Sequence, residues 1–400
     1  MNFLNKRAII SVVISKRGEK CMKRAGIYVD NLNGEAMYQS FKPNPLPPIP
    51  EIEMDGEIVK LLVDANKQLV KLDTASQLIS NADLFISMYV RKEALISSQI
   101  EGTQCTLDDV LDPEVEANAN LDVSDVINYV KATQYALKRL ERLPLCCRLI
   151  REIHEVLMEN VRGQDKTPGE FRHSQNWIGP ANCSLKDARY IPPNVEDLQT
   201  AMSDLEKYIN ENVDYDPLIR AALIHYQFET IHPFLDGNGR IGRLLILLYL
   251  MEQRLIEKPV IYISYFLKKN QIEYYDRISE VRRTGNFEQW IRFFLEAVSK
   301  AASDSLEAIR QLSVLHDTNV EKLPKTTRSK DNLRAVFDYI EQYPIIDIKR
   351  TAKELEVSYN TVAAAVRKLV ELGILQETTN AARNRVFAYE EYLAILRKDT

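Results

Sequence analysis

The residue types best suited to chemistry are gathered in one stretch of thirteen residues, Ile231 to Arg243, which has the sequence IHPFLDGNGRIGR. It contains one imidazole, one carboxylate, two guanidinium groups and three glycines. Glycines allow the backbone to approach a ligand closely, and the first turn of a helix presents N–H groups and a positive dipole end. We therefore predict that a helix beginning near Asn238 binds an anion at its N-terminus.

The charged side chains of this stretch have the spacing expected of a site for a phosphorylated ligand. Arg240 and Arg243 lie three residues apart, so on a helix both can face one pocket and bind different phosphates. Asp236 precedes them and offers the hard oxygen ligand that Mg²⁺ prefers. His232, four residues earlier, can reach the reacting centre as a general base.

Each of these residues also has a purely structural explanation. A histidine before a proline can end the preceding helix, a glycine-rich turn can simply reverse the chain, and arginine pairs on helices are usually solvated or salt-bridged. Their combination favours a ligand, because three glycines weaken the start of a helix and nothing else obviously requires them. We expect Phe234 and Leu235 to anchor the loop to the core and Pro233 to stiffen it.

The stretch resembles the signature of the Fic family of AMP-transferring enzymes, H-P-F-x-D/E-G-N-G-R-x-x-R. The residues that match it, without departure, are His232, Pro233, Phe234, Asp236, Gly237, Asn238, Gly239, Arg240 and Arg243. So long a signature is highly specific. The resemblance also takes in an N-terminal strap, a helical domain and a C-terminal winged helix, so it covers nearly everything after about residue 35.

The resemblance implies a mechanism in which ATP is the substrate and Mg²⁺ the cofactor. His232 would take the proton of a target hydroxyl, which attacks the α-phosphorus in line and expels pyrophosphate. Asp236 would hold the Mg²⁺ that bridges the α- and β-phosphates. Backbone N–H groups and the Asn238 side chain would form the anion hole, with Arg240 at the β-phosphate and Arg243 at the γ-phosphate. The implied nucleotide-binding residues are Gly237, Asn238, Gly239, Arg240, Ile241, Gly242, Arg243 and, beside the adenine, Tyr274 and Tyr275. Tyrosine pairs are more often packing residues, so the last two could instead belong to the core.

A second motif, SSQIEG, places Ser97 and Glu101 one helical turn apart, with Gly102 next, where a helix would stop. The structural alternative is a helix end with an exposed glutamate. The helix dipole disfavours an acid at this end, so a basic partner is expected. The motif matches the inhibitory motif of the Fic family, [S/T]-x-x-x-E-[G/N]. The resemblance implies that Glu101 pairs with Arg243 and takes the place of the γ-phosphate.

One clear non-helical insert, between Trp177 and Pro193, interrupts the helical region. It contains WIGP, a polar turn and RYIPP, and it resembles the β-hairpin flap of the family. An exposed strand edge could pair with the backbone of a target protein, so we expect the target to dock near residues 177–193. The alternative is an ordinary surface hairpin. The residues that resemble the approach to the flap are Gly169, Phe171 and Arg172.

The rest of the chain predicts a mainly α-helical fold that could position these residues. Apolar residues recur at three- and four-residue spacing after a proline-rich strap, Lys42 to Pro50. The expected helices are Ile58–Ile79, Leu84–Ile100, Val123–Leu143, Arg148–Val161, Val195–Asn210, Pro217–Ile231, Gly239–Glu252, Gln271–Arg283 and Phe287–Leu315. We therefore predict a Fic-type helical domain with a small β-hairpin flap.

The C-terminal part predicts a separate winged helix-turn-helix, because three helices are followed by two short β-like runs. Polar residues begin its third helix and could contact DNA, namely Ser358, Tyr359, Asn360 and Thr361. Alanine and valine fill the middle of that helix, so DNA binding and a protein-binding or dimer-forming wing are equally open. The expected domains are an N-terminal extension (1–35), a strap and helices with the inhibitory motif (36–120), a catalytic domain (121–317), a linker (318–331) and the winged helix (332–400).

Composition restricts the class of protein. The 400 residues are 45% hydrophobic and 27% charged, as in a soluble globular protein of two or three domains, and the net charge of -5 gives no general attraction for nucleic acid. Five scattered cysteines without a C-x-x-C pair indicate thiols in a reducing compartment. The apolar run Ala8 to Ile14 is much shorter than a membrane span. We expect a cytoplasmic protein without membrane contact, with an alternative start at Met22.

Two functional classes stay open at this point. One is an enzyme that transfers AMP to a hydroxyl group, with phosphate transfer or AMP removal by the same site as variants. The other is a DNA-binding regulator whose helical domain only senses a nucleotide. His232 favours the enzyme, because a sensor has no need of a general base.

Overall fold

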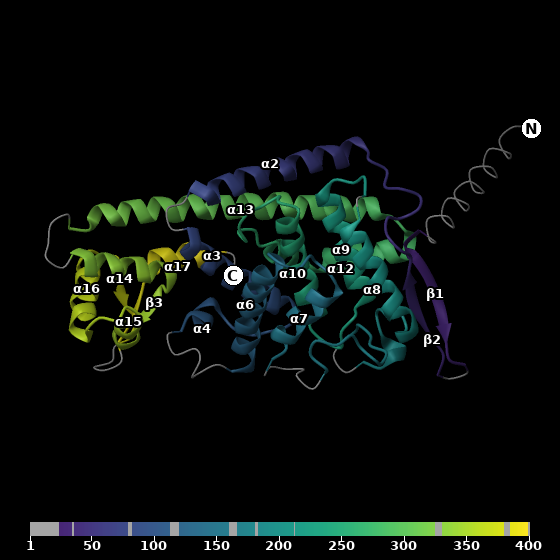
Figure 1. Ribbon diagram of the computed structural model, residues 1–400, viewed down its shortest axis with the longest axis horizontal. Coiled ribbons are helices and arrows are strands. Elements are labelled where there is room, and N and C mark those ends of the chain that lie inside the picture. The colour runs from purple at the N-terminus through teal and green to yellow at the C-terminus, as the bar shows by residue number, and fades with distance from the viewer. Residues whose placement is uncertain are drawn as a thin grey trace, which may run out of the picture. The chain divides into compact units, whose positions relative to one another are not determined.

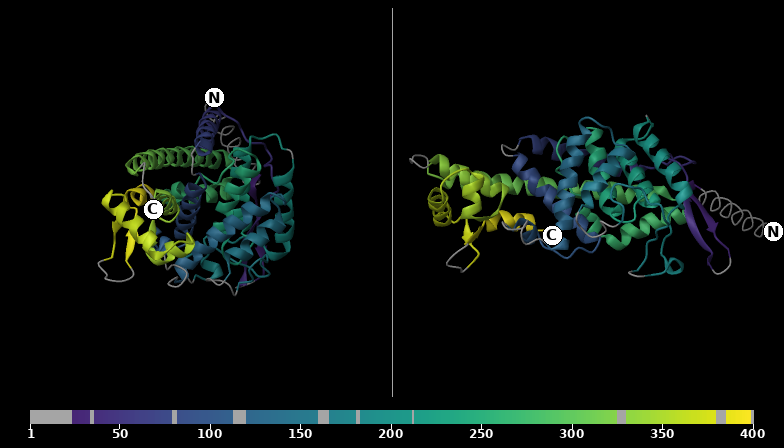
Figure 2. Two further views of the ribbon diagram at one scale, coloured as in Figure 1. Left: turned by 60° about the vertical axis from the view of Figure 1, so that its left-hand side comes forward. Right: turned by 60° about the horizontal axis from the view of Figure 1, so that its bottom comes forward.

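The computed structural model describes residues 24–33, 36–78, 82–112, 120–159, 166–180, 183–211, 213–324, 330–379 and 385–398 (Figure 1). These residues form a mainly α-helical structure with two small antiparallel sheets, which confirms the mainly α-helical fold (Figure 2). The chain divides into two compact units, of which the first contains residues up to Lys67, Lys131–Arg254 and Lys269–Ser299. The second contains Gln68–Val130, Leu255–Lys268 and the residues from Lys300 onward.

Every stretch predicted to be helical contains a helix. These helices are α2 (Gly56–Leu78), α3 (Ala82–Ile100), α6 (Leu121–Leu140), α7 (Cys147–Leu157), α8 (Val195–Asn210), α9 (Pro217–Ile231), α10 (Asn238–Glu252), α12 (Gln271–Thr284) and α13 (Phe287–Lys322). Two more, α4 (Leu107–Leu111) and α11 (Ser264–Lys269), escape prediction because so few residues cannot show a helical period. Of the helices that the structure describes, none combines the length and the apolar character needed to cross a bilayer.

Helices α9 and α10 form the centre of the first unit and carry the predicted site between them. Apolar residues occupy nearly all their sides, and both helices are almost completely buried. Asp216 caps α9 by accepting a hydrogen bond from the N–H of Leu218, and Pro217 takes the first position, where its missing N–H costs nothing. The helices approach closely at Gly242, where an added Cβ atom would lie 2.3 Å from Oε1 of Glu229.

The N-terminal strap of the first unit is a two-stranded antiparallel sheet, in which β1 (Gly26–Asn31) pairs with β2 (Tyr38–Pro43). Immediately before β1, the buried side chain of Arg24 binds the two carboxylate oxygens of Glu288 in α13 at 2.9 and 3.0 Å. The predicted boundary at residue 35 falls between β1 and β2, so the ordered N-terminal part begins earlier than expected, and the division into domains stays a prediction. The residues before Arg24, including the alternative start, lie outside the described residues.

The C-terminal module lies in the second unit and combines helices with a three-stranded sheet of order β3-β5-β4. Its elements are α14 (Lys330–Gln342), β3 (Ile345–Asp347), α15 (Ile348–Glu354), α16 (Tyr359–Glu371), β4 (Gln376–Glu377), β5 (Val386–Ala388) and α17 (Glu390–Arg397). Ser358 caps α16 by accepting a hydrogen bond from the N–H of Thr361. The last helix, α17, is an addition to the predicted order, and the assignment as a winged helix-turn-helix stays a prediction.

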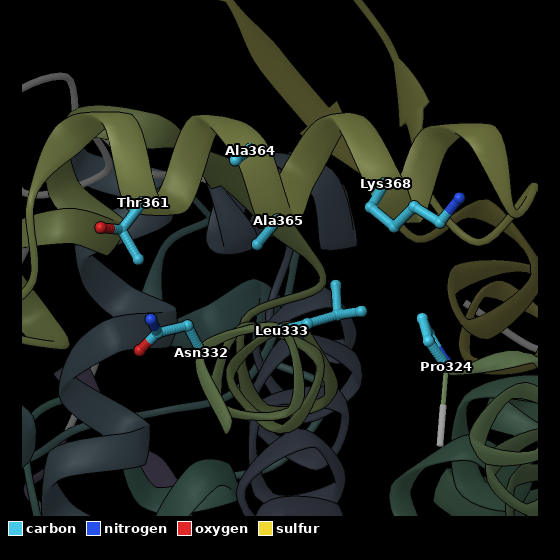
Figure 3. A pocket seen from close by; sticks show the side chains of 7 residues that line it. All are labelled: Pro324, Asn332, Leu333, Thr361, Ala364, Ala365 and Lys368. Atoms are coloured by element: carbon cyan, nitrogen blue, oxygen red, sulfur yellow. The ribbon is translucent and has the colours of Figure 1, made fainter. Parts of the chain in front are cut away.

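A cavity of about 400 Å³ lies beside α16 in this module (Figure 3). Its lining residues are Pro324, Asn332, Leu333, Thr361, Ala364, Ala365 and Lys368. Figure 3 shows that α16 lines it with a single face, opposite α14.

Pro324 follows the end of α13, which continues to Lys322. The predicted linker at 318–331 is therefore too long at both ends, since α13 occupies its first residues and α14 begins at Lys330; residues 325–329 lie outside the described part of the chain.

Candidate active site around His232

His232 ends helix α9 in a left-handed backbone conformation, with φ 50° and ψ 62°. Its N–H still donates to the carbonyl of Phe228 at 2.9 Å, so the residue closes the last helical turn before the chain reverses. A left-handed conformation is unfavourable for a residue with a Cβ atom and persists only where the surroundings hold it. The backbone of His232 is therefore fixed by its neighbours in the fold.

The imidazole of His232 is suited to accept a proton. Its Nδ1 atom is buried and has no hydrogen-bond partner among the described residues. Burial, followed by the positive charges of Arg282 and Arg172, lowers the pKa of His232 to about 3. The ring is therefore neutral at pH 7, which is the state that a general base requires.

The loop after His232 is held by the side chain of Asn238. Its amide oxygen accepts from the N–H of Phe234 and its amide nitrogen donates to the carbonyl of Phe234, both at 2.8 Å. Each end of this side chain thus makes a hydrogen bond within the loop, and the second N–H of the amide and the backbone N–H are the groups by which Asn238 could contribute to an anion site. The ring of Phe234 is fully buried, which confirms its expected role as an anchor.

Asp236 presents a partly exposed carboxylate at the mouth of the loop. Its Oδ1 accepts from the N–H of Gly237 at 2.7 Å, and its Oδ2 forms an ion pair with Lys166 at 3.0 Å. Burial alone would raise the pKa of Asp236, but Lys166, Arg240 and the Gly237 N–H together hold it below its ordinary value. The carboxylate is therefore ionised at pH 7 and chemically suited to Mg²⁺, which binds through one or two carboxylates together with substrate phosphates.

Helix α10 begins beside this carboxylate. Its N-cap residue is Gly237, which has φ 73°, and none of the described side chains caps the helix. Two cations lie within its first two turns, and both Arg240 and Arg243 are almost completely buried. Arg240 lies 3.9 Å from Oδ1 of Asp236. The structure thus brings the helix N-terminus, the guanidinium group of Arg240 and the carboxylate of Asp236 together. Arg243 is buried one turn further along α10, and the side chain of Ile241 belongs to the core.

His154, in α7, belongs to this site and was not predicted. Its ring stacks on that of Phe234 with centroids 3.7 Å apart. Nδ1 accepts from the N–H of Gly169 at 2.9 Å and Nε2 donates to the carbonyl of Asp236 at 3.1 Å. Burial lowers the pKa of His154 to about 4, so the ring stays neutral and can serve both partners. A single histidine in an amphipathic helix gives no signal by which the sequence could reveal this role.

The predicted flap follows a segment that contacts the loop directly. Arg172 and Asn176 both donate to the carbonyl of His232, at 3.1 Å each. Among the described residues, the two sides of the flap are joined by one antiparallel bridge, between Ile178 and Tyr190. The flap is therefore an irregular loop with a single bridge and a short 3-10 turn (Leu185–Asp187) in place of a regular hairpin.

The two tyrosines of α12 have different surroundings. Tyr274 is buried, and its hydroxyl lies 2.8 Å from Nε2 of His225, whose Nδ1 lies 2.9 Å from the carbonyl of Gly242. Because a carbonyl only accepts, Nδ1 carries the proton and Nε2 accepts from the tyrosine. Tyr274 therefore braces α10 through His225. Tyr275 is partly exposed beside it, with ring centroids 5.0 Å apart, and a contact of either tyrosine with adenine stays a prediction.

The second motif lies in the other compact unit. Helix α3 ends at Ile100, and Gly102 adopts φ 95°, so the chain leaves the helix where the sequence predicts. Ser97 is fully buried, whereas Glu101 is exposed. The pairing of Glu101 with Arg243 stays a prediction.

Comparison with known proteins bears on both motifs. The Fic/DOC family N-terminal model matches residues 59–138, and the Fic/DOC family model matches residues 144–250. Protein adenylyltransferase Fic of Aedes aegypti is 30% identical over 200 residues, which are 50% of this chain and 36% of the relative. Its namesake in Culex quinquefasciatus is 33% identical over 164 residues, which are 40% of this chain and 29% of the relative.

A crystal structure of a Fic family protein from Desulfovibrio desulfuricans G20 shares the fold. It covers 84% of this chain and 97% of its own, with a TM-score of 0.54 and 18% identity. The chain spans only about a third of the length of the curated relatives it matches. The two family matches contain, in turn, the motif at 97–102 and the loop at 231–243. Two regions of the chain thus match, in turn, the N-terminal model and the core model of the Fic/DOC family.

Proposed function

We propose that this protein transfers AMP from ATP to a serine, threonine or tyrosine hydroxyl of a target protein. The observation that carries the proposal is the neutral, partly exposed imidazole of His232 in the loop that leads to the N-terminus of α10, which none of the described side chains caps. The names of the relatives, protein adenylyltransferases, support it.

In the proposed reaction, His232 accepts the proton of the target hydroxyl. The hydroxyl oxygen forms a bond to the α-phosphorus of ATP, the bond between that phosphorus and the bridging oxygen breaks, and pyrophosphate leaves. The N–H groups at the start of α10 and the buried guanidinium groups of Arg240 and Arg243 bind the phosphates and stabilise the charge that develops. Positioning and charge stabilisation thus supply most of the rate.

Asp236 is the residue that would hold Mg²⁺. The ion would neutralise phosphate charge when bound. In the structure the carboxylate binds Lys166, so Mg²⁺ must compete with an ammonium group for the same oxygens.

We further propose that Glu101 restrains the enzyme by pairing with Arg243 in the place of the γ-phosphate. Glu101 directly follows the end of α3, where the helix dipole favours the pairing of an acid with a basic partner. The target protein would dock along residues 177–193, where the side chain of Trp177 is 42% exposed. The C-terminal module would act as a winged helix, either on DNA or as a protein-binding or dimer-forming wing, in a cytoplasmic protein.

Transfer of label from ATP distinguishes the proposed reaction from its rivals. The purified chain is incubated with Mg²⁺ and ATP labelled at the α- or at the γ-phosphorus, with its own hydroxyl groups as acceptors. Label retained in protein from α-labelled ATP alone supports AMP transfer. Label from γ-labelled ATP would indicate phosphate transfer. Binding of ATP without any transfer would favour a nucleotide-sensing regulator, and release of AMP from a modified protein would favour AMP removal.

A further inference from the structure

The segment at the base of the flap holds three consecutive carbonyl groups of the loop after α9. The N–H of Arg172 donates to the carbonyl of Pro233 at 2.9 Å, and its Nε donates to that of His232 at 3.1 Å. The amide nitrogen of Asn176 donates to the carbonyl groups of His232 and Phe234 at 3.1 and 2.8 Å. The carbonyl of His232 thus has two side-chain donors.

The same segment holds the far end of the flap. The guanidinium of Arg172 also donates to the carbonyl of Pro193, and the amide nitrogen of Gln175 donates to that of Pro192 at 3.1 Å. The side chain of Arg172 is 1% exposed. One short segment therefore anchors both ends of the flap and the backbone of His232.

This anchor answers a physical need of His232. Its left-handed backbone is unfavourable for any residue with a Cβ atom, so it has to be maintained by contacts from outside the loop. Its N–H is already bound to Phe228, so the carbonyl is the remaining backbone group by which the fold can fix the direction of the side chain. Arg172 and Asn176 hold that carbonyl.

We propose that Arg172 and Asn176 are positioning residues, which fix the imidazole of His232 relative to the flap. The proposal rests on the proposed AMP transfer, in which the flap presents the target hydroxyl and His232 removes its proton. Because one anchor places both, a displacement of the flap is transmitted to the base.

The test replaces Asn176 by leucine, which has a similar size and neither donors nor charge. The fold should tolerate Asn176→Leu, because each carbonyl group that loses Asn176 retains another donor. The carbonyl of His232 is still bound by Arg172, and that of Phe234 by Asn238. The Oδ1 atom of Asn176 that is removed is buried and has no hydrogen-bond partner among the described residues. His173→Ala is the matched control, since it changes a largely exposed side chain of the same segment and leaves the hydrogen bonds to the loop and to the flap in place.

We expect Asn176→Leu to lower kcat by about a hundredfold while KM for ATP and the thermal unfolding midpoint stay close to wild type, and His173→Ala to keep its kcat within about twofold. The imidazole is followed independently by NMR of labelled histidine, which is practical because the chain has five histidines. The titration midpoint of His232 should move from its lowered value toward the ordinary one in Asn176→Leu, because a loosened loop exposes the ring.

An unchanged kcat in folded Asn176→Leu would overturn the proposal, and so would an unchanged His232 resonance. If Asn176→Leu does not fold, Arg172→Lys is measured in the same two ways, with the same expectations, since it keeps the cation and loses the Nε donor. If the wild type transfers no AMP at all, the proposed function fails, and the His232 resonance alone still decides whether this segment positions the imidazole.

Discussion

Asp236 is the residue whose carboxylate we expect to bind Mg²⁺. It is ionised, partly exposed and bound to Lys166, and one carboxylate with substrate phosphates is a usual Mg²⁺ site. Asp236→Ala should therefore lose AMP transfer by at least about a hundredfold, and the residual activity should no longer respond to Mg²⁺. Lys166→Ala is the control, because it frees the same carboxylate and should lower the Mg²⁺ concentration for half-maximal activity. A variant Asp236→Ala that keeps the Mg²⁺ dependence of the wild type contradicts this role.

At the residue scale, the sequence predicts the residues that would contact a ligand better than it predicts the residues that position them. His232, Asp236 and the two arginines stand in one short stretch, so their spacing is visible in the sequence. The partners of that stretch are distant in the chain: His154 reaches Asp236 across 82 positions and Arg172 reaches His232 across 60. No local pattern encodes such contacts. For the same reason the sequence could not show that the Asn238 side chain turns inward to Phe234.

The end of helix α3 carries the prediction with the most unusual sign. If Glu101 pairs with Arg243 in the place of the γ-phosphate, its removal releases both the guanidinium and the space, so Glu101→Gly should be faster than wild type. Charge-assisted hydrogen bonds contribute about 1.5–3 kcal/mol, which corresponds to an acceleration of roughly ten- to a hundredfold. Self-modification with α-labelled ATP measures it.

Gln104→Gly serves as the control for Glu101→Gly, because it changes an exposed residue of the same loop and should leave the rate unchanged. A variant Glu101→Gly that is equal to or slower than the wild type would mean that residues 97–102 form only a helix end, or that Glu101 serves another step such as AMP removal.

At the element scale, the long helices and the two short β-like runs of the C-terminal module were predictable, whereas the strands β1 and β2 were not. Stretches such as α9 and α10 contain enough apolar residues to predict a buried helix. The strands β1 and β2 have six residues each, and β2 ends in the proline-rich stretch, so their pairing depends on contacts that the sequence does not display. The flap was located correctly, but its irregular form depends on the contacts of Arg172 with distant carbonyl groups.

Two histidines, one in each compact unit, should contribute to stability with opposite pH dependence. The first is His154. Its pKa of about 4 lies below the value of about 6.5 for an unfolded histidine, so the unfolded chain binds a proton between these values that the folded chain does not. Stability contributed by the neutral ring is present above pH 6.5 and lost as the pH falls.

His154→Gln can still donate and accept a hydrogen bond but does not titrate. Between pH 7 and pH 5 the wild type should lose about 2 kcal/mol more unfolding free energy than this variant. Urea unfolding at both values measures the difference, and His173→Gln, on a largely exposed side chain, should behave as the wild type. An equal pH dependence in wild type and His154→Gln contradicts the assignment.

In the second unit, His316 of α13 lies 2.6 Å from Glu341 of α14. The hydrogen bond to Glu341 is the main cause that raises the pKa of His316, and the charge of Asp317 adds to it. Burial and the charge of Arg334 act in the opposite direction but are outweighed. A raised pKa means that this stability is complete below the unfolded value and is lost as the pH rises through the folded one. The thermal unfolding midpoint of the wild type should therefore exceed that of His316→Gln by more at pH 6 than at pH 9. An equal difference at both pH values would contradict the raised pKa of His316.

The central claim is that His232 is the base of an AMP transfer, and the most direct measurement compares His232→Ala with His173→Ala using α-labelled ATP. Removal of a general base costs about a hundred- to ten-thousandfold in rate, while ATP binds through α10 and its arginines. We expect His232→Ala to lose transfer on this scale and to bind ATP with wild-type affinity, and His173→Ala to keep both. Undiminished transfer by His232→Ala would contradict it.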